Sequence, residues 1–199
     1  QLRSWRAQRQ PLAYGTSKYD VIASTGALWV CLCLDDHRLG PMSTFLLSLV
    51  PDLFEAFQLR DNEELSETAH DVLVQVASHP FSAAQVPVLL EALLDILRRS
   101  ESWHSRLDAL PLLQIVYYQN LYLLSHDMKR CILDVLCSLL HDPHVEVRDM
   151  AATTLAGIVR CSQRAYITEL SQTFADMAAV PIPRRGSPGY EAAMTQVHA

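Results

Sequence analysis

The sequence has few glycines and no Asn-Gly or Asp-Gly dipeptide, the pairs that most often close tight β-hairpins. Only six glycines occur in 199 residues, which argues against an all-β fold. Positive charge is also scarce, because 16 Lys and Arg stand against 22 Asp and Glu and the formal net charge is -6. An acidic chain has no electrostatic reason to bind nucleic acid or an anionic membrane directly. We therefore expect neither as a partner.

Long hydrophobic runs and a secretory signal are missing as well. The longest apolar stretch, residues 25–34, is too short to span a bilayer, and nothing at the start resembles a signal peptide. The cysteines are odd in number and lie in apolar stretches expected to be helical: Cys31, Cys33, Cys131, Cys137 and Cys161. Reduced core thiols are more consistent with this pattern than a disulfide framework is. We expect a soluble intracellular protein.

No catalytic or metal-binding pattern stands out. Ser102 and His104 are two residues apart on an expected helix, so their side chains diverge, and with Asp108 they indicate a surface helix start rather than a catalytic group. His141 and His144 flank an Asp-Pro pair without a third ligand at useful spacing. There is no phosphate-binding glycine loop. We expect no enzymatic activity, no metal and no cofactor.

Helical periodicity is what the sequence has in abundance. Half of the residues are apolar, enough for a sizeable core. Short turn and cap signals separate the periodic segments. The pattern predicts helices over 17–34, 42–59, 63–78, 83–99, 102–124, 127–140, 143–160 and 165–178, with another beginning near residue 189. Because short loops join consecutive helices, neighbouring helices should be antiparallel.

The expected helices repeat along the chain. Ala69, Ala109 and Ala151 come into register at offsets of 40 and 42 residues, and the same offsets relate Leu73, Leu113 and Leu155. This period is typical of two-helix HEAT or armadillo repeats. The sequence therefore predicts an all-α solenoid of antiparallel helix pairs over residues 1–178. A solenoid segment also exposes apolar end faces, so we expect this one to be prone to self-association.

The segment 142–160 is the best copy of the repeat. Asp142 is the expected N-cap and Pro143 the first helical residue. One apolar stripe follows at helical spacing: Val147, Met150, Ala151, Thr154, Leu155 and Ile158. The small residues Ala151, Ala152 and Gly157 would allow another helix to approach closely. Arg148 either pairs with an acid such as Asp108 or Asp149, or lies on a solvated face. The predicted repeat interface contains Asp142, Arg148, Ala151 and Leu155.

Two stretches resemble a known family. "EVRDMAATTLAGIVRC" (146–161) and "WHSRLDALPLLQIVYYQNLYLL" (103–124) are similar to the C-terminal region of the giant single-chain HEAT-repeat proteasome activators, the proteasome activator complex subunit 4 family. The resemblance implies a helical cap on the core (20S) proteasome that opens its gate without ATP. It further implies degradation of acetylated histones without ubiquitin, in nucleus and cytoplasm. Residues 102–178 would correspond to a bromodomain-like part of the family.

The same resemblance suggests an acetyl-lysine site, for which an amide donor and an apolar slot are needed. Where the family has an Asn-Phe pair after the helix, this chain has Ser162 and Gln163. Tyr117, Tyr118 and Asn120 are the other candidates. Their alternative interpretation is a set of core aromatics with a hydrogen-bonded polar tip.

The last residues differ from the family. Residues 179–190 form a linker rich in Pro and Gly, in which Arg184-Arg185 and Ser187-Pro188 are either a weak import or phosphorylation signal or a plain surface loop. Residues 191–199 would begin a further helix. The chain ends without the family's hydrophobic-Tyr tail, so we expect either an internal fragment or a divergent relative. A generic HEAT adaptor that binds partner peptides on its concave face is the alternative function.

Overall fold

The computed structural model describes Ser4 and residues 17–35, 43–162, 164–179, 189–191 and 194. These contain the helices α2 (Lys18–Asp35), α3 (Ser43–Ser48), α4 (Val50–Phe57), α5 (Glu63–Ser78), α6 (Val86–Arg99), α7 (Trp103–Gln119), α8 (His126–Leu139), α9 (Val145–Arg160) and α10 (Arg164–Ala178). No strand occurs among the described residues. The all-α expectation is confirmed.

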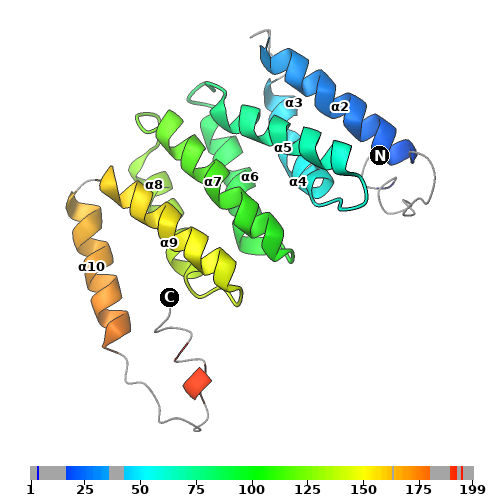
Figure 1. Ribbon diagram of the computed structural model, residues 1–199. Coiled ribbons are helices and arrows are strands. Elements are labelled where there is room, and N and C mark those ends of the chain that lie inside the picture. Colours follow the sequence, from blue (N-terminus) through cyan, green and yellow to red (C-terminus); the bar gives the residue numbers. More distant parts are fainter. Residues whose placement is uncertain are drawn as a thin grey trace.

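The helices form two layers. In one layer α5, α7 and α9 lie side by side, and α2 packs against α5 at one end of the row (Figure 1). In the other layer α4, α6 and α8 follow one another. Short turns join α4 to α5, α6 to α7 and α8 to α9, and the members of each pair pack on each other. This is the predicted solenoid of helix pairs.

The repeat seen in the sequence is also a repeat of burial. Ala69, Ala109 and Ala151 are each 0% exposed, at equivalent places on α5, α7 and α9. The three leucines in register, Leu73, Leu113 and Leu155, are at most 5% exposed. The small alanine side chain allows neighbouring helix backbones to come close, and the leucine four residues later lies on the same buried face of its helix.

Two predicted helices differ from the structure. The expected helix over 42–59 is interrupted, because α3 ends at Ser48 and α4 begins at Val50. Pro51 explains the break, since it has no N–H to donate to a carbonyl of the preceding turn. The expected helix over 102–124 ends at Gln119, because the carbonyl of Asn120 accepts from the N–H groups of both Leu123 and Leu124. A tight turn thus replaces the last predicted helical turn.

The start predicted for the helix over 143–160 is wrong by two residues. α9 begins at Val145 with His144 as its N-cap, and Pro143 lies outside it. Asp142 is therefore not the N-cap of α9. Its carboxylate instead accepts a hydrogen bond from the backbone N–H of His144 at 2.9 Å, within the turn between α8 and α9. An Asp-Pro pair is compatible with either geometry, because Pro143 fixes only its own φ.

Two smaller expectations about burial are also wrong. Ala152 lies on the exposed side of α9, so it does not contribute to close helix packing. Cys161 is exposed rather than buried, whereas Cys31, Cys33, Cys131 and Cys137 are half-buried free thiols. Burial and the nearby Asp134 carboxylate raise the pKa of Cys137. The predicted linker residues Arg184, Arg185, Ser187 and Pro188 lie outside the described residues.

Candidate functional site

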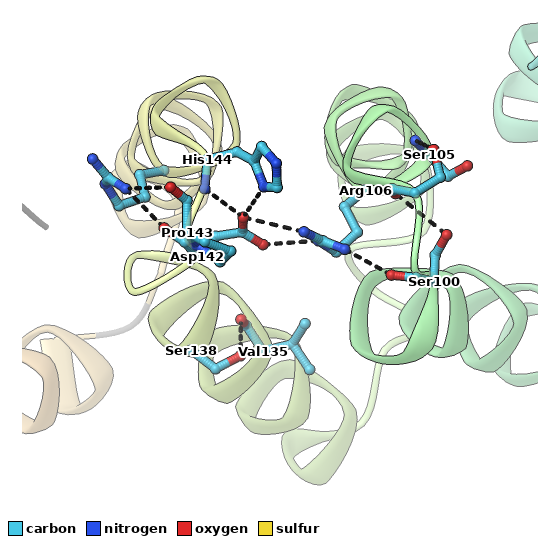
Figure 2. A network of polar contacts seen from close by, with 10 residues as sticks. Ser100, Ser105, Arg106, Val135, Ser138, Asp142, Pro143 and His144 are labelled. Carbon is cyan, nitrogen blue, oxygen red and sulfur yellow. Dashed lines mark hydrogen bonds and ion pairs between the residues drawn. The ribbon is translucent and has the colours of Figure 1, made fainter. Parts of the chain in front are cut away.

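The turn between α8 and α9 is joined to the preceding helix pair by a buried ion pair. Arg106 of α7 donates from Nε to Oδ2 of Asp142 at 2.8 Å and from Nη2 to Oδ1 at 3.2 Å (Figure 2). The two side chains are 12% and 5% exposed. Nη1 of Arg106 also donates to the carbonyl of Ser100 at 2.7 Å, so the guanidinium is satisfied on both sides. This bidentate contact fixes one repeat against the next.

The electrostatics of Asp142 follow from these contacts. Burial opposes its negative charge, but hydrogen bonds from Arg106 and from the backbone of His144 outweigh burial and hold its pKa below the ordinary value. The His144 imidazole adds a contact at 3.3 Å between Nδ1 and Oδ1. Asp142 is therefore a charged, saturated acceptor inside the repeat interface, as expected for a structural rather than a catalytic carboxylate.

Arg148 stabilises the same turn through backbone carbonyls. Its Nη1 donates to the backbone carbonyl of Asp142 at 2.8 Å and to that of Pro143 at 3.3 Å. The predicted pairing with Asp108 or Asp149 is replaced by these carbonyl contacts, because Arg148 lies one turn into α9 and its side chain points back over the turn. Arg106 and Arg148 thus hold the side chain and the backbone of Asp142, respectively.

A row of aromatic rings continues from the Arg106–Asp142 ion pair along the same edge of the solenoid. The Trp103 ring stacks on His104 with centroids 3.7 Å apart, and it also stacks on His144 of the next repeat at 5.2 Å. On the other side, Nη2 of Arg60 lies 2.8 Å from Nε2 of His104. The edge formed by the α4–α5, α6–α7 and α8–α9 turns is therefore connected across three helix pairs. We call these residues the turn-edge row: Arg60, His104, Trp103, His144, Asp142 and Arg106.

Of this row, the sequence pattern predicts only Asp142 as an interface residue. It places His104 in a surface helix start, which agrees with its partial exposure but leaves Arg60 out. A usable signal existed, because Arg60 and His104 are 44 residues apart, close to the repeat offset of 40 to 42. Residues separated by about one period in a solenoid lie on neighbouring repeats.

The candidate acetyl-lysine residues lie around the end of α7 and of α9. The buried Asn120 uses its amide Nδ2 to donate to the carbonyl of Val116 at 2.9 Å, which caps its own helix. Tyr117 is 2% exposed and stacks edge-on against Tyr118. Ser162 donates to the carbonyl of Ile158 at 2.9 Å. Gln163 lies outside the described residues. The amide donor and the inner ring of this group are thus engaged within the fold.

Tyr117 also shows the signature of a core aromatic. Burial raises the pKa of its phenol, and the hydrogen-bonded contact with Ser162 only partly opposes this effect. Tyr118 is 39% exposed, and its hydroxyl lies beside Gly157 of α9, where an added Cβ would be 3.2 Å from it and 2.7 Å from the Gln114 amide nitrogen. Gly157 therefore permits the close approach of α7 and α9 that the sequence predicted.

Two hollows in the described part of the chain have no acetyl-lysine candidate among their lining residues. One hollow of about 270 Å³ lies between α4, α6 and the start of α7; it is lined in part by Phe54, Glu55, Asp95 and Arg99. Another, of about 150 Å³, lies between α8 and α10 near Tyr166. No group of three or more His, Cys, Asp or Glu suited to a metal ion occurs in the described residues. Nor is any described helix both long and apolar enough to cross a membrane.

Comparison with known proteins agrees with this architecture. A HEAT-repeat family model matches residues 132–162, which include most of α8 and all of α9. The fold and this match define the chain as a HEAT-type α-solenoid. It is 32% identical over 145 residues to proteasome activator complex subunit 4A of Danio rerio, and 30% identical over 144 residues to proteasome activator complex subunit 4 of Homo sapiens.

In both cases the match covers 70% of this chain and 8% of the relative. The Bos taurus protein of the same name is 30% identical over 151 residues, 72% of this chain. The resemblance seen in residues 103–124 and 146–161 is confirmed: the chain is related to the proteasome activator complex subunit 4 family. It spans only a small part of the length of these relatives.

Proposed function

We propose that the chain is a scaffold segment of a proteasome activator. In this role it would form part of a helical cap on the 20S core proteasome that admits substrates without ATP or ubiquitin, acetylated histones among them, and act in the nucleus and cytoplasm. The proposal includes no catalytic activity of its own. The observation that carries it is the sequence relationship to proteins named proteasome activators over 70% of the chain.

The contacts between repeats support a scaffold role. Arg106 and Asp142 are nearly buried and saturated, and the turn-edge row connects three helix pairs. These contacts make the relative orientation of the pairs well defined, which a cap built of stacked repeats requires. The alternative function, a generic adaptor that binds peptides on its concave face, would use the same scaffold, so geometry alone favours neither.

A chimera separates the two functions. The matched segment of the human relative is replaced by the aligned residues of this chain, and stimulation of core-proteasome peptidase activity is measured. We expect the chimera to retain stimulation, and an Asp142→Asn version to lose part of it because the repeat joint is weakened. A folded chimera without stimulation would contradict a proteasome-activator role and favour the generic adaptor.

Recognition of acetyl-lysine is the finer part of the proposal. Of the described candidates, Tyr118 is the most accessible side chain, whereas the Asn120 amide is engaged with Val116. We propose that any acetyl-lysine contact in this region involves Tyr118. The test is a titration with matched acetylated and unacetylated histone-tail peptides. Acetyl-dependent binding that is lost in Tyr118→Phe supports the site, and equal binding of both peptides contradicts it.

A further inference from the structure

His104 faces two groups of opposite charge on different repeats. Its Nε2 lies 2.8 Å from Nη2 of Arg60, which belongs to the turn between α4 and α5. A guanidinium can only donate hydrogen bonds, so His104 must accept through Nε2 and its ring must be neutral in this contact. The Arg60 contact therefore holds only as long as His104 carries no proton on that nitrogen.

Asp108 supplies the competing partner. It lies four residues after His104 on α7, the spacing at which two helical side chains share a face. Burial raises the pKa of Asp108, and the hydrogen bond from Gln58 followed by the charges of His104 and His70 partly offset the effect. The Asp108 carboxylate is thus within electrostatic range of the His104 ring, and Gln58 holds it at 3.2 Å.

We propose that His104 is a pH-sensitive connector between the α4–α5 and α6–α7 helix pairs, bound to Arg60 when neutral and to Asp108 when protonated. Protonation places two cations at the Arg60 contact, which breaks it, while the same charge is attracted to the Asp108 carboxylate on its own helix. Acidification that protonates His104 therefore loosens the joint between these two pairs.

Other titratable groups near His104 influence how the joints between helix pairs respond to acidification. His70 of α5 also faces Asp108, and once protonated it competes for the carboxylate. On the far side of Trp103, His144 lies 3.3 Å from the Asp142 carboxylate, which Arg106 already neutralises. Protonation of His144 adds a positive charge to an existing contact with an acid, so the joint at the α8–α9 turn keeps its partners. Protonation thus breaks the contact of His104 with Arg60 but keeps the contact of His144 with Asp142.

Hydrogen exchange of the intact chain tests the connector. Protection of residues 58–62, in the α4–α5 turn, is compared with that of residues 140–144, in the α8–α9 turn, between pH 7.5 and 5.5 after correction for intrinsic exchange. We expect protection of 58–62 to fall about fivefold, the factor equivalent to one typical net hydrogen bond, while that of 140–144 stays constant. An equal response of both turns, or none, would overturn the proposal.

Variants separate His104 from its neighbours. In His104→Gln the amide oxygen can still accept from Arg60 but cannot be protonated, so the pH response of 58–62 should disappear while protection at pH 7.5 is kept. His70→Gln and His144→Gln are matched controls that should retain the response. Arg60→Gln, at an exposed position, should lower the protection of residues 58–62 at pH 7.5 and abolish its dependence on pH. A response that persists in His104→Gln would assign it to another group and refute the connector.

Discussion

At the scale of single residues, the strongest constraint is the pair of Arg106 and Asp142. Asp142→Asn leaves the guanidinium of Arg106 nearly buried without a counter-charge, so we expect a loss of about 3 kcal/mol in unfolding free energy at pH 7. Asp149→Asn, at an exposed acid of the following helix α9, is the control and should change little. Urea unfolding of the three proteins measures the difference. Equal stability of Asp142→Asn and the control would show that the pair is not a structural contact.

The same carboxylate predicts how stability depends on pH. Because the folded-state pKa of Asp142 lies below the ordinary value of 3.8, its contribution to stability is complete above that value and is lost as the pH falls through the lower folded-state pKa. Wild type should therefore lose stability more steeply than Asp142→Asn in acid, below about pH 4. Unfolding midpoints measured from pH 6 to 3 check this, and parallel curves would contradict it.

Thr154 is a second residue whose side chain should lower the stability of the fold. Its side chain is fully buried in α9, and its hydroxyl has no hydrogen-bond partner among the residues that the structure describes. Thr154→Val replaces this hydroxyl by a methyl group of similar shape, and we expect stabilisation by about 1 kcal/mol. The neighbouring Thr153 is exposed and donates to the carbonyl of Asp149, so Thr153→Val is the matched control and should stabilise nothing. Thermal unfolding that ranks the two variants the other way would be inconsistent with this account.

At the scale of helices, the sequence predicted the pairs and their period because both depend on local patterns. Apolar spacing and turn residues locate helices, and Ala69, Ala109 and Ala151 are buried at equivalent places as the register required. The ends of the helices were less predictable. Pro51 can begin a new helix or lie in the first turn of a longer one. An Asp-Pro pair likewise permits the following helix to start at any of several residues.

The site was harder to predict than the fold for a physical reason. Whether Asp142 caps its own helix or binds Arg106 depends on how neighbouring repeats are placed, which no local pattern specifies. The same holds for Asn120, whose amide was a candidate donor for a ligand but donates to Val116. Among the polar contacts across repeats, the one between Arg60 and His104 had a sequence signal in its separation, which is close to the repeat offset.

Helix packing offers a direct test with adjacent residues. Ala151 is fully buried on α9, which packs against α7, whereas Ala152 on the same turn is exposed. Ala151→Leu inserts a larger side chain where two helix backbones approach, and we expect it to destabilise the protein by about 1–3 kcal/mol or more. Ala152→Leu should have almost no effect. Similar unfolding midpoints for both variants would mean that this layer can rearrange to accept a larger residue.

At the scale of the whole molecule, most helix contacts in the described part of the chain lie within helix pairs or between neighbouring pairs. Stability is therefore close to a sum of terms for pairs and for joints, and a change at one joint stays local. The turn-edge row passes through two successive joints, because Arg60 of the α4–α5 turn contacts His104, and Trp103 beside it stacks on His144 of the α8–α9 turn. If His104 releases Arg60 on acidification, the curvature of the stack changes at one joint while the next is retained.

The exposed apolar side of α2 leads to the last prediction. Val21, Leu28, Trp29 and Leu32 recur at helical spacing on α2 and are between 42% and 68% exposed, while its opposite side packs on α5. A helix that is apolar on both sides is stable in water only when both are covered. We expect the chain to self-associate through this face as its concentration rises.

Light scattering over a range of concentrations measures this association. Leu28→Glu together with Leu32→Glu places two charges in the exposed face without touching the α5 contact, so the variant should remain monomeric at concentrations where wild type does not. Val88→Glu, at an exposed apolar residue of α6, is the matched control and should associate as wild type does. Association that is unchanged in the α2 double variant but lost in the control would place the contact on the α4–α6–α8 layer. A wild-type chain that is monomeric throughout would show that α2 is covered in another way.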